Sequence, residues 1–176
     1  MIIFRGRRRY VFLGALVSAL ALISDQAAKF AVLSGFREMS EIIEVTGFLN
    51  LVLVWNRGVS FGMFSGDSPW NTVFLIILAL GIVAFLLTWL FRTERRVLAV
   101  ALGLVIGGAF GNVIDRFFHG AVVDFLDFHV GNWHWPAFNI ADGAITVGAV
   151  VLIADALFRG GEKHKIMERD NVDGVG

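Results

Sequence analysis

The sequence predicts an all-α membrane protein, a single domain in which four transmembrane helices form a bundle with a small β-sheet platform at its outer face. Hydrophobic residues make up 57% of the 176 residues and the mean hydropathy is +0.74, both far above the values typical of soluble domains. Four apolar stretches are each long enough to cross a bilayer, which takes roughly 20 residues. Residues 42–56 alternate in the manner of one or two β-strands and are interrupted by Gly47.

The predicted spans are residues 10–33, 69–91, 97–117 and 138–158. Ser68 and Pro69 suit the N-cap and the first helical position of the second span. Segments 34–68 and 118–137 connect the spans on the outer side. The polar tail, 160–176, is expected to be flexible.

Basic residues cluster before the first span, between the second and third, and after the fourth, whereas the opposite side carries few. By the positive-inside rule, both termini are cytoplasmic and the two long connections face outward. The first span could also be interpreted as a cleavable signal peptide. Its retention is favoured by Asp25 and Lys29, which share one helix face, because a discarded segment has no need of a paired carboxylate and amine.

The outer connections carry interfacial features. Trp133 and Trp135, with Trp70 at the start of the second span, match the aromatic belt of a membrane interface. A strand at 42–56 cannot expose its edges to hydrocarbon, so we expect it to lie at the interface and to pair with itself or with the second connection. This segment either anchors the protein or forms a platform on which a lipid-linked substrate docks.

The amino-acid composition limits the kinds of partner and the kinds of catalytic group that this protein can use. The net charge is zero, so the charge balance does not indicate a nucleic-acid partner. The absence of cysteine excludes disulfides, thiolate metal ligands and a cysteine nucleophile. A carboxylate at membrane depth is costly and rarely lacks a function, which makes Asp124 and Asp142 the leading candidates. Two nearby buried carboxyls raise one pKa and thereby supply an acid and a base.

The polar clusters also have structural interpretations. Glycines recur every four residues from Gly103 to Gly111, a spacing that predicts close helix packing. Asp115 can form an ion pair with Arg116 at a helix end. Asp142 can stabilise the first turn of a helix through the helix dipole.

Two further sites have weaker support. Ser60 with Lys29 as base would form a nucleophilic dyad, but no third residue supports it. His129 and His134 with Asp127 could bind a metal ion, but their spacing fits no familiar site.

Five motifs, in order along nearly the whole chain, resemble those of signal peptidase II, the prolipoprotein signal peptidase of bacteria. They are DQAAK (25–29), NRGVSFGMF (56–64), GGAFGNVIDR (107–116), VVDF (122–125) and FNIADGAITVG (138–148). The resemblance implies an aspartic endopeptidase of the bacterial inner membrane whose active site faces the periplasm. Such an enzyme cuts a prolipoprotein before its diacylglyceryl-modified cysteine.

The resemblance also assigns residues and partners. Asp124 and Asp142 match the catalytic pair. Other functional positions of the family, which would orient the pair or hold the substrate's backbone and lipid headgroup, match Asp25, Lys29, Asn56, Gly58, Asn112, Asp115, Arg116, Asn139 and Ala141. It implies lipid-modified prolipoproteins and membrane lipid as partners, inhibition by globomycin-like cyclic peptides, and neither a metal ion nor an organic cofactor.

Two functions of other classes compete with this one. A proton-coupled transporter would use Asp25, Asp115, Asp124 and Asp142 as a relay through the membrane. It is disfavoured because the acidic residues gather toward the outer side and the chain has no internal repeat. A non-catalytic receptor for lipidated peptides would use the same groove, and would retain its function when either candidate aspartate is replaced.

Overall fold

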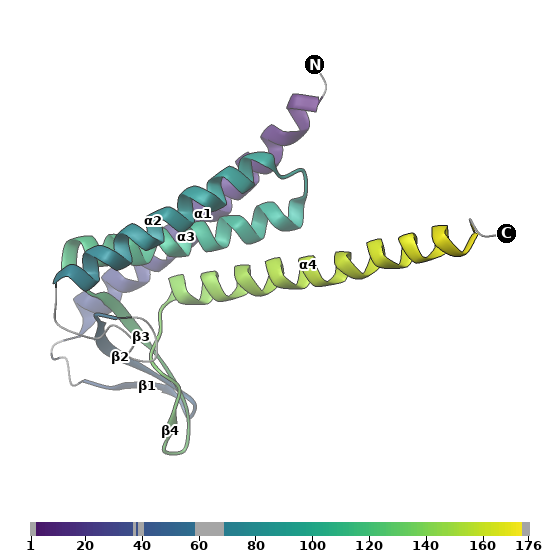
Figure 1. Ribbon diagram of the computed structural model, residues 1–176. Helices are drawn as coiled ribbons and strands as arrows, with labels where there is room; N and C mark the ends of the chain where they lie inside the picture. The colour runs from purple at the N-terminus through teal and green to yellow at the C-terminus, as the bar shows by residue number, and fades with distance from the viewer. Residues whose placement is uncertain (1–2, 37, 39–40, 59–68, 174–176) are drawn as a thin grey trace.

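The computed structural model describes residues 3–36, 38, 41–58 and 69–173, in which four helices carry a four-stranded antiparallel sheet at one end (Figure 1). The helices are α1 (Ile3–Gly35), α2 (Pro69–Arg92), α3 (Arg96–His119) and α4 (Ile140–Asp173). Each contains a stretch long and apolar enough to span a membrane: Arg8–Gly35, Trp70–Arg92, Arg96–His119 and Ile140–Phe158. The predicted fold class is therefore confirmed.

Two helix ends bear on the predictions. Pro69 is the first residue of α2, as expected, whereas its expected N-cap, Ser68, lies outside the described residues. Helix α4 continues to Asp173, so residues 160–173 are helical, a conformation that the sequence did not predict. Glutamate, lysine and arginine between residues 162 and 169 are strong helix formers, which accounts for the continuation.

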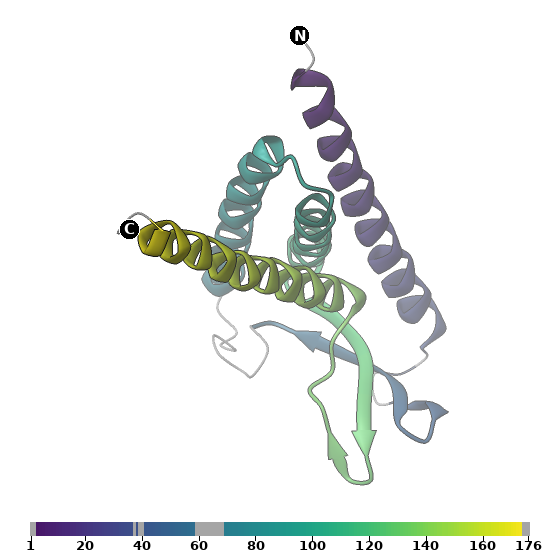
Figure 2. The same ribbon diagram turned by 90° about the vertical axis from the view of Figure 1, so that its right-hand side faces the viewer.

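Helix α3 lies at the centre of the bundle and packs against α1, α2 and α4 (Figures 1 and 2). Its side chains Leu102 and Ile106 are almost fully buried against Leu90 and Val83 of α2. By contrast, the outer faces of α1, α2 and α4 expose large apolar side chains, among them Phe12, Phe85 and Ile153. An apolar exterior around an apolar core is expected of a protein surrounded by lipid.

The glycine repeat allows α1 and α3 to approach closely. A Cβ atom placed on Gly103 would lie 2.5 Å from the carbonyl oxygen of Gly14, and one on Gly107 would lie 2.4 Å from that of Ser18. Any side chain at these positions would therefore collide with the backbone of α1. The predicted role of the glycines in helix packing is confirmed.

The strands are β1 (Ile43–Thr46), β2 (Leu49–Asn56), β3 (Val122–Val130) and β4 (Trp133–His134), adjacent in that order. The segment 42–56 thus forms two strands, and β2 pairs with β3 from the second outer connection, as expected. Gly120 ends α3 with a positive φ of 69°, and β3 begins two residues later. This tight turn brings the first half of β3 back beneath the end of α3.

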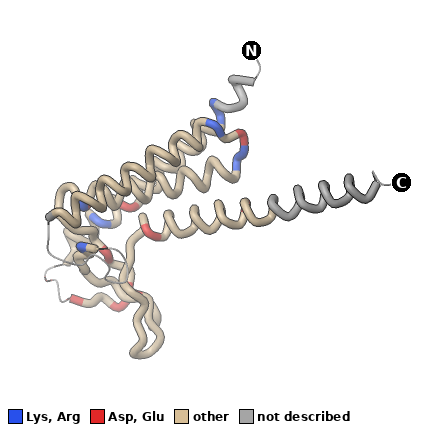
Figure 3. The backbone as a smooth tube through the Cα atoms, in the orientation of Figure 1, with Lys and Arg blue, Asp and Glu red and all other residues tan. Residues whose placement is uncertain are grey.

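The end of the bundle opposite the sheet holds both ends of the chain and the α2–α3 connection (Figures 1 and 3). Arg92, Arg95 and Arg96 lie in or beside this connection. There Arg95 forms a bidentate ion pair with Asp155 of α4. The arrangement agrees with a topology in which the termini share one side of the membrane and the sheet lies on the other.

Candidate active site

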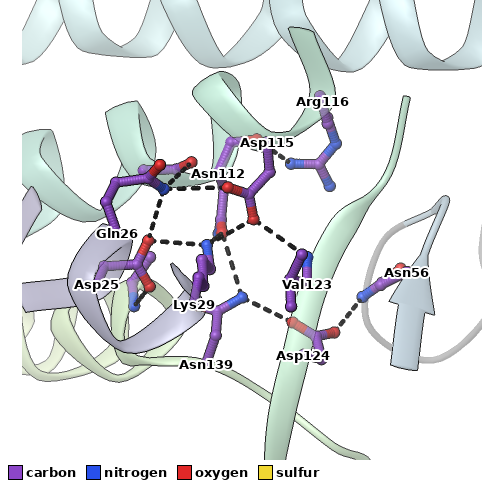
Figure 4. A network of polar contacts seen from close by, with 12 residues as sticks. Asp25, Gln26, Lys29, Asn56, Asn112, Asp115, Arg116, Val123, Asp124 and Asn139 are labelled. Atoms are coloured by element: carbon purple, nitrogen blue, oxygen red, sulfur yellow. Dashed lines mark hydrogen bonds and ion pairs between the residues drawn. The ribbon is translucent and has the colours of Figure 1, made fainter. Parts of the chain in front are cut away.

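A buried polar network lies where the helices meet the sheet (Figure 4). It draws side chains from α1, α3, β2, β3 and the start of α4. Several members are almost completely shielded from solvent: Asp25 and Asn139 are 0% exposed, Asp124 is 1% exposed and Asp115 is 3% exposed. So many polar groups are retained in an apolar setting only when they are satisfied by one another.

The start of α4 is capped by Asn139, which precedes the helix rather than lying within it as predicted. The Asn139 Oδ1 atom accepts the backbone N–H of Asp142 at 2.9 Å, and the Asp142 Oδ2 atom accepts the backbone N–H of Asn139 at 3.4 Å. This reciprocal pair is a capping box, which selects the position where the helix begins. Asp142 therefore has the predicted structural role at the helix start, in addition to any chemical role.

Asn139 also reaches the second candidate aspartate. Its Nδ2 atom donates to Asp124 Oδ1 at 2.6 Å, so one side chain contacts Asp124 and the backbone of Asp142. The neighbouring Phe138 exchanges backbone hydrogen bonds with Leu126 of β3 at 2.8 and 3.1 Å, which holds this segment against the strand. Asp124 and Asp142, 18 residues apart in the sequence, are in this way brought to one site.

Asn112 of α3 completes the link between the two aspartates. Its Nδ2 atom donates to Asp142 Oδ1 at 2.8 Å, and its Oδ1 atom accepts from Asn139 Nδ2 at 3.3 Å. The same Oδ1 atom accepts from Lys29 Nζ at 3.3 Å, which leaves the amide nitrogen of Asn112 facing Asp142.

Asp124 lies on β3, and Asn56 at the end of β2 donates its Nδ2 atom to Asp124 Oδ2 at 2.9 Å. Burial raises the pKa of Asp124 to about 6, the charge of Asp142 adds to the rise, and the hydrogen bonds from Asn56 and Asn139 oppose it. At neutral pH this carboxyl is consequently much closer to exchanging a proton than an ordinary aspartate.

Lys29 lies between two buried carboxylates. Its Nζ atom is 2.8 Å from Asp25 Oδ2 and 2.7 Å from Asp115 Oδ2. The predicted pair of Asp25 and Lys29 is confirmed, but the alternative pairing of Asp115 with Arg116 is wrong. Close packing of α1 on α3 brings Lys29 to Asp115, whereas the Arg116 guanidinium donates to the carbonyl oxygens of Gly58 at 2.9 Å and Asn112 at 3.4 Å.

Gln26 belongs to the network and was not predicted. Its Nε2 atom lies 3.0 Å from Asp115 Oδ1, 3.2 Å from Asp25 Oδ2 and 3.3 Å from the Gly111 carbonyl oxygen. A glutamine beside a carboxylate in an apolar helix is a signal in itself, but only the packing of α1 on α3 identifies its partners. Ala141, a predicted site residue, takes part through its backbone, since its N–H donates to Asp25 Oδ1 at 2.8 Å.

The two weaker candidate sites differ in outcome. Asp127 accepts from Asn50 at 3.0 Å and contacts His134 Nδ1 at 2.9 Å, while His129 stacks on His134 with ring centroids 5.1 Å apart. Among the described residues no group of three histidine, aspartate or glutamate side chains is arranged to hold a metal ion. The dyad of Ser60 with Lys29 falls partly outside the described residues.

A cavity of about 420 Å³ adjoins the site. Asp142 lines it together with residues 135–138, which lead into α4, and with Gly143, Thr146 and Val147 of the first turns of that helix. A larger cavity of about 730 Å³ is lined by Trp55, His119 and neighbouring residues, and neither aspartate is among its lining residues. Of these two cavities, the smaller is the one that Asp142 lines.

Comparison with known proteins agrees with this geometry. A family model described as signal peptidase (SPase) II matches residues 17–158. Proteins named lipoprotein signal peptidase from Burkholderia vietnamiensis and Burkholderia cenocepacia are 46% and 47% identical over 145 and 146 residues, which cover 81% of this chain and 86% of each relative.

Two solved structures, each described as a bacterial membrane enzyme, share the fold. The first has a TM-score of 0.77 at 30% identity and covers 85% of this chain and 90% of its own. The second has a TM-score of 0.71 at 31% identity and covers 82% of this chain and 92% of its own. The likeness thus extends over nearly the whole helical bundle and sheet.

Proposed function

Because this chain belongs to the signal peptidase II family, we propose that it removes the signal peptide from diacylglyceryl-modified prolipoproteins, cutting before the lipid-modified cysteine. The observation that carries the proposal is the pair of aspartates, Asp124 and Asp142, bridged by Asn139 beside a cavity at the sheet end of the bundle. Two carboxyls in one site supply both a general acid and a general base.

In the proposed reaction, one carboxylate of the pair takes a proton from water, and the water attacks the scissile carbonyl carbon. The other carboxyl, protonated, donates a hydrogen bond to the carbonyl oxygen and then a proton to the leaving amine. The raised pKa of Asp124 supports a pair that shares one proton near neutral pH. The two groups titrate jointly, so the shared proton belongs to the pair. The proposal involves neither a metal ion nor an organic cofactor.

Substrate recognition would use the polar groups around the pair. Arg116 already binds the Gly58 carbonyl oxygen, which places its guanidinium beside the segment that follows β2. From there it could contact the substrate backbone or the lipid headgroup region, while Asn112 and Asn56 keep the aspartates oriented. The diacylglyceryl anchor of the substrate would stay in the bilayer and present the cleavage site to the pair, which lowers the entropic cost of alignment.

The chain is a multi-pass membrane protein, and we propose the bacterial inner membrane as its location. Both termini would be cytoplasmic and the sheet would face the periplasm, in line with the basic residues at the end of the bundle opposite the sheet (Figure 3). Globomycin-like cyclic peptides are proposed as inhibitors that compete for the same site.

A gel-shift assay tests the proposal. Purified full-length protein in detergent is mixed with a diacylglyceryl-modified prolipoprotein, and wild type is compared with Asp124→Asn and Asp142→Asn. Asp127→Asn is the matched control, because Asp127 is buried on the same strand but bonds Asn50 and His134 instead. Cleavage by wild type and the control, with none by the two folded variants, is the expected result. Binding without cleavage by wild type would favour the receptor function.

A further inference from the structure

The two candidate catalytic aspartates share a backbone feature. The N–H of Val123, the residue before Asp124, donates to Asp115 Oδ2 at 3.1 Å. The N–H of Ala141, the residue before Asp142, donates to Asp25 Oδ1 at 2.8 Å. Each aspartate of the pair is thus preceded by a backbone group that is anchored to a different buried carboxylate.

The two anchoring carboxylates are tied to each other (Figure 4). Lys29 Nζ joins them at 2.8 Å from Asp25 Oδ2 and 2.7 Å from Asp115 Oδ2. Gln26 Nε2 joins them a second time at 3.2 Å from Asp25 Oδ2 and 3.0 Å from Asp115 Oδ1. Every oxygen atom of the two carboxylates therefore has a partner, and Lys29 is only 2% exposed.

The surrounding packing leaves little room for this unit to shift. A Cβ atom on Gly111 would lie 2.6 Å from Asp25 Oδ2, so α3 touches the carboxylate directly. Gly107 packs against the α1 backbone one turn away with similar closeness. In a close-packed interior, the positions of the Asp25 and Asp115 carboxylates therefore fix the positions of the backbone groups that they bind, one in α4 and one in β3.

We propose that Asp25, Gln26, Lys29 and Asp115 act together as a spacer that sets the distance between the Asp124 and Asp142 carboxyls through the backbone. The hydrogen bonds and ion pairs of these four side chains go to one another, to backbone groups and to Asn112 rather than to the Asp124 or Asp142 carboxyl, so we assign them as positioning residues; the proposal rests on the proposed function of the pair. Gln26 lies within the DQAAK motif, but it is the one member of the spacer to which the resemblance to signal peptidase II assigned no role. Misplacement of a catalytic group by about 1 Å can cost roughly 100-fold in rate, so a loosened spacer should slow catalysis.

Gln26 offers the cleanest test because it is uncharged. Replacing Lys29 would leave two buried carboxylates unpaired and would also remove a charge that acts on Asp124. Gln26→Leu removes one connection and leaves the ion pairs in place. Its control is Thr93→Val, which also replaces a buried polar side chain, at the other end of the bundle, where the Thr93 hydroxyl has no hydrogen-bond partner among the described residues.

The experiment measures kcat, KM, the pH–rate profile and the folded fraction of the full-length protein in detergent. Gln26→Leu should lower kcat at least 10-fold with KM within about 2-fold of wild type. The basic limb of its profile should shift to lower pH, because two carboxyls held less closely repel each other less and the second of them ionises more readily. Thr93→Val should match wild type. A fall in kcat that only follows the folded fraction, with the pH profile unmoved, would overturn the proposal.

A second pair of variants tests the backbone anchor. In Asp25→Asn the amide oxygen can still accept the Ala141 N–H, whereas in Asp25→Leu nothing can. The asparagine variant should therefore keep at least 10-fold more kcat per folded molecule than the leucine variant, and equal activities would refute the anchoring role. If wild type itself fails to cleave, the proposed function fails. The spacer then still predicts that Gln26→Leu weakens the pH dependence of unfolding that arises from Asp124, and an unchanged dependence would refute it.

Discussion

The raised pKa of Asp124 makes the stability of the protein fall as pH rises, and replacing this residue should remove that dependence. In the folded protein burial raises the pKa from 3.8 to about 6. Between these values the folded state keeps a proton that the unfolded state has lost, so the free energy of unfolding decreases with increasing pH. A rise in pKa from 3.8 to about 6 corresponds to about 3 kcal/mol of unfolding free energy lost between pH 4 and pH 7.

Thermal unfolding of detergent-purified wild type and Asp124→Asn at pH 4.5 and 7.5 measures this effect. About 3 kcal/mol corresponds to roughly 6–12 °C in Tm for a chain of this size. When pH is raised from 4.5 to 7.5, the Tm of the asparagine variant should therefore rise relative to that of wild type by up to this amount. Any constant cost of the substitution cancels in this comparison, including the clash of two amide donors near Asn56.

Asp127, on the same strand as Asp124, provides a control because its pKa is shifted in the opposite direction. Burial by itself would raise the pKa of Asp127, but the hydrogen bonds from His134 and Asn50 and the adjacent imidazoles outweigh burial and lower the pKa. Asp127 therefore contributes stability above about pH 4 that is lost as pH falls, and Asp127→Asn should flatten the acid side of the curve. If wild type and Asp124→Asn differ equally in Tm at both pH values, the assigned environment of Asp124 is wrong.

Three further substitutions separate structural from chemical roles. Asn139→Ser keeps a hydroxyl that can cap α4, so the Tm of this variant should stay close to that of wild type. The variant loses the amide that donates to Asp124, so its kcat should fall at least 10-fold in the gel-shift assay. Gly107→Ala should cost about 1–3 kcal/mol in thermal unfolding because its Cβ meets the α1 backbone, whereas Gly81→Ala, which meets nothing within 4 Å, should be neutral or stabilising. Lys29→Met should destabilise by about 3–5 kcal/mol, and restoration of Tm by adding Asp115→Asn would confirm that an unpaired carboxylate is the cause.

Much of the architecture could be predicted because it depends on patterns local to the chain. A run of about 20 apolar residues is a helix in lipid whatever it packs against, since its backbone must be satisfied internally. Strand-like residues 42–56 needed a partner at the interface, and β3 in the second outer connection is that partner. The glycines at four-residue steps indicated a close helix contact, which α1 supplies.

The candidate site was predictable in its membership but not in its contacts. Asp124, Asp142 and the supporting residues stand out as polar groups in apolar surroundings. The alternative pairing of Asp115 with Arg116 was wrong because adjacent positions on a helix face different neighbours, and Lys29 of α1 reached the carboxylate instead. Gln26 was missed because its partner Asp115 lies 89 positions away in the sequence, and only the packing of α1 on α3 brings the two together.

By itself the sequence determined that this protein spans a membrane four times, presents a sheet at one end and retains carboxylates there, because hydropathy and periodicity act over a single turn or strand. Only the tertiary structure decided which of these groups meet. Asn139 caps α4 and contacts Asp124 because the backbone of Phe138 is hydrogen-bonded to β3. Asp25 accepts a backbone N–H from a residue 116 positions away because the glycines of α3 allow α1 to pack closely against it. Contacts of this kind depend on how elements pack, and buried polar groups accept only those arrangements that satisfy them.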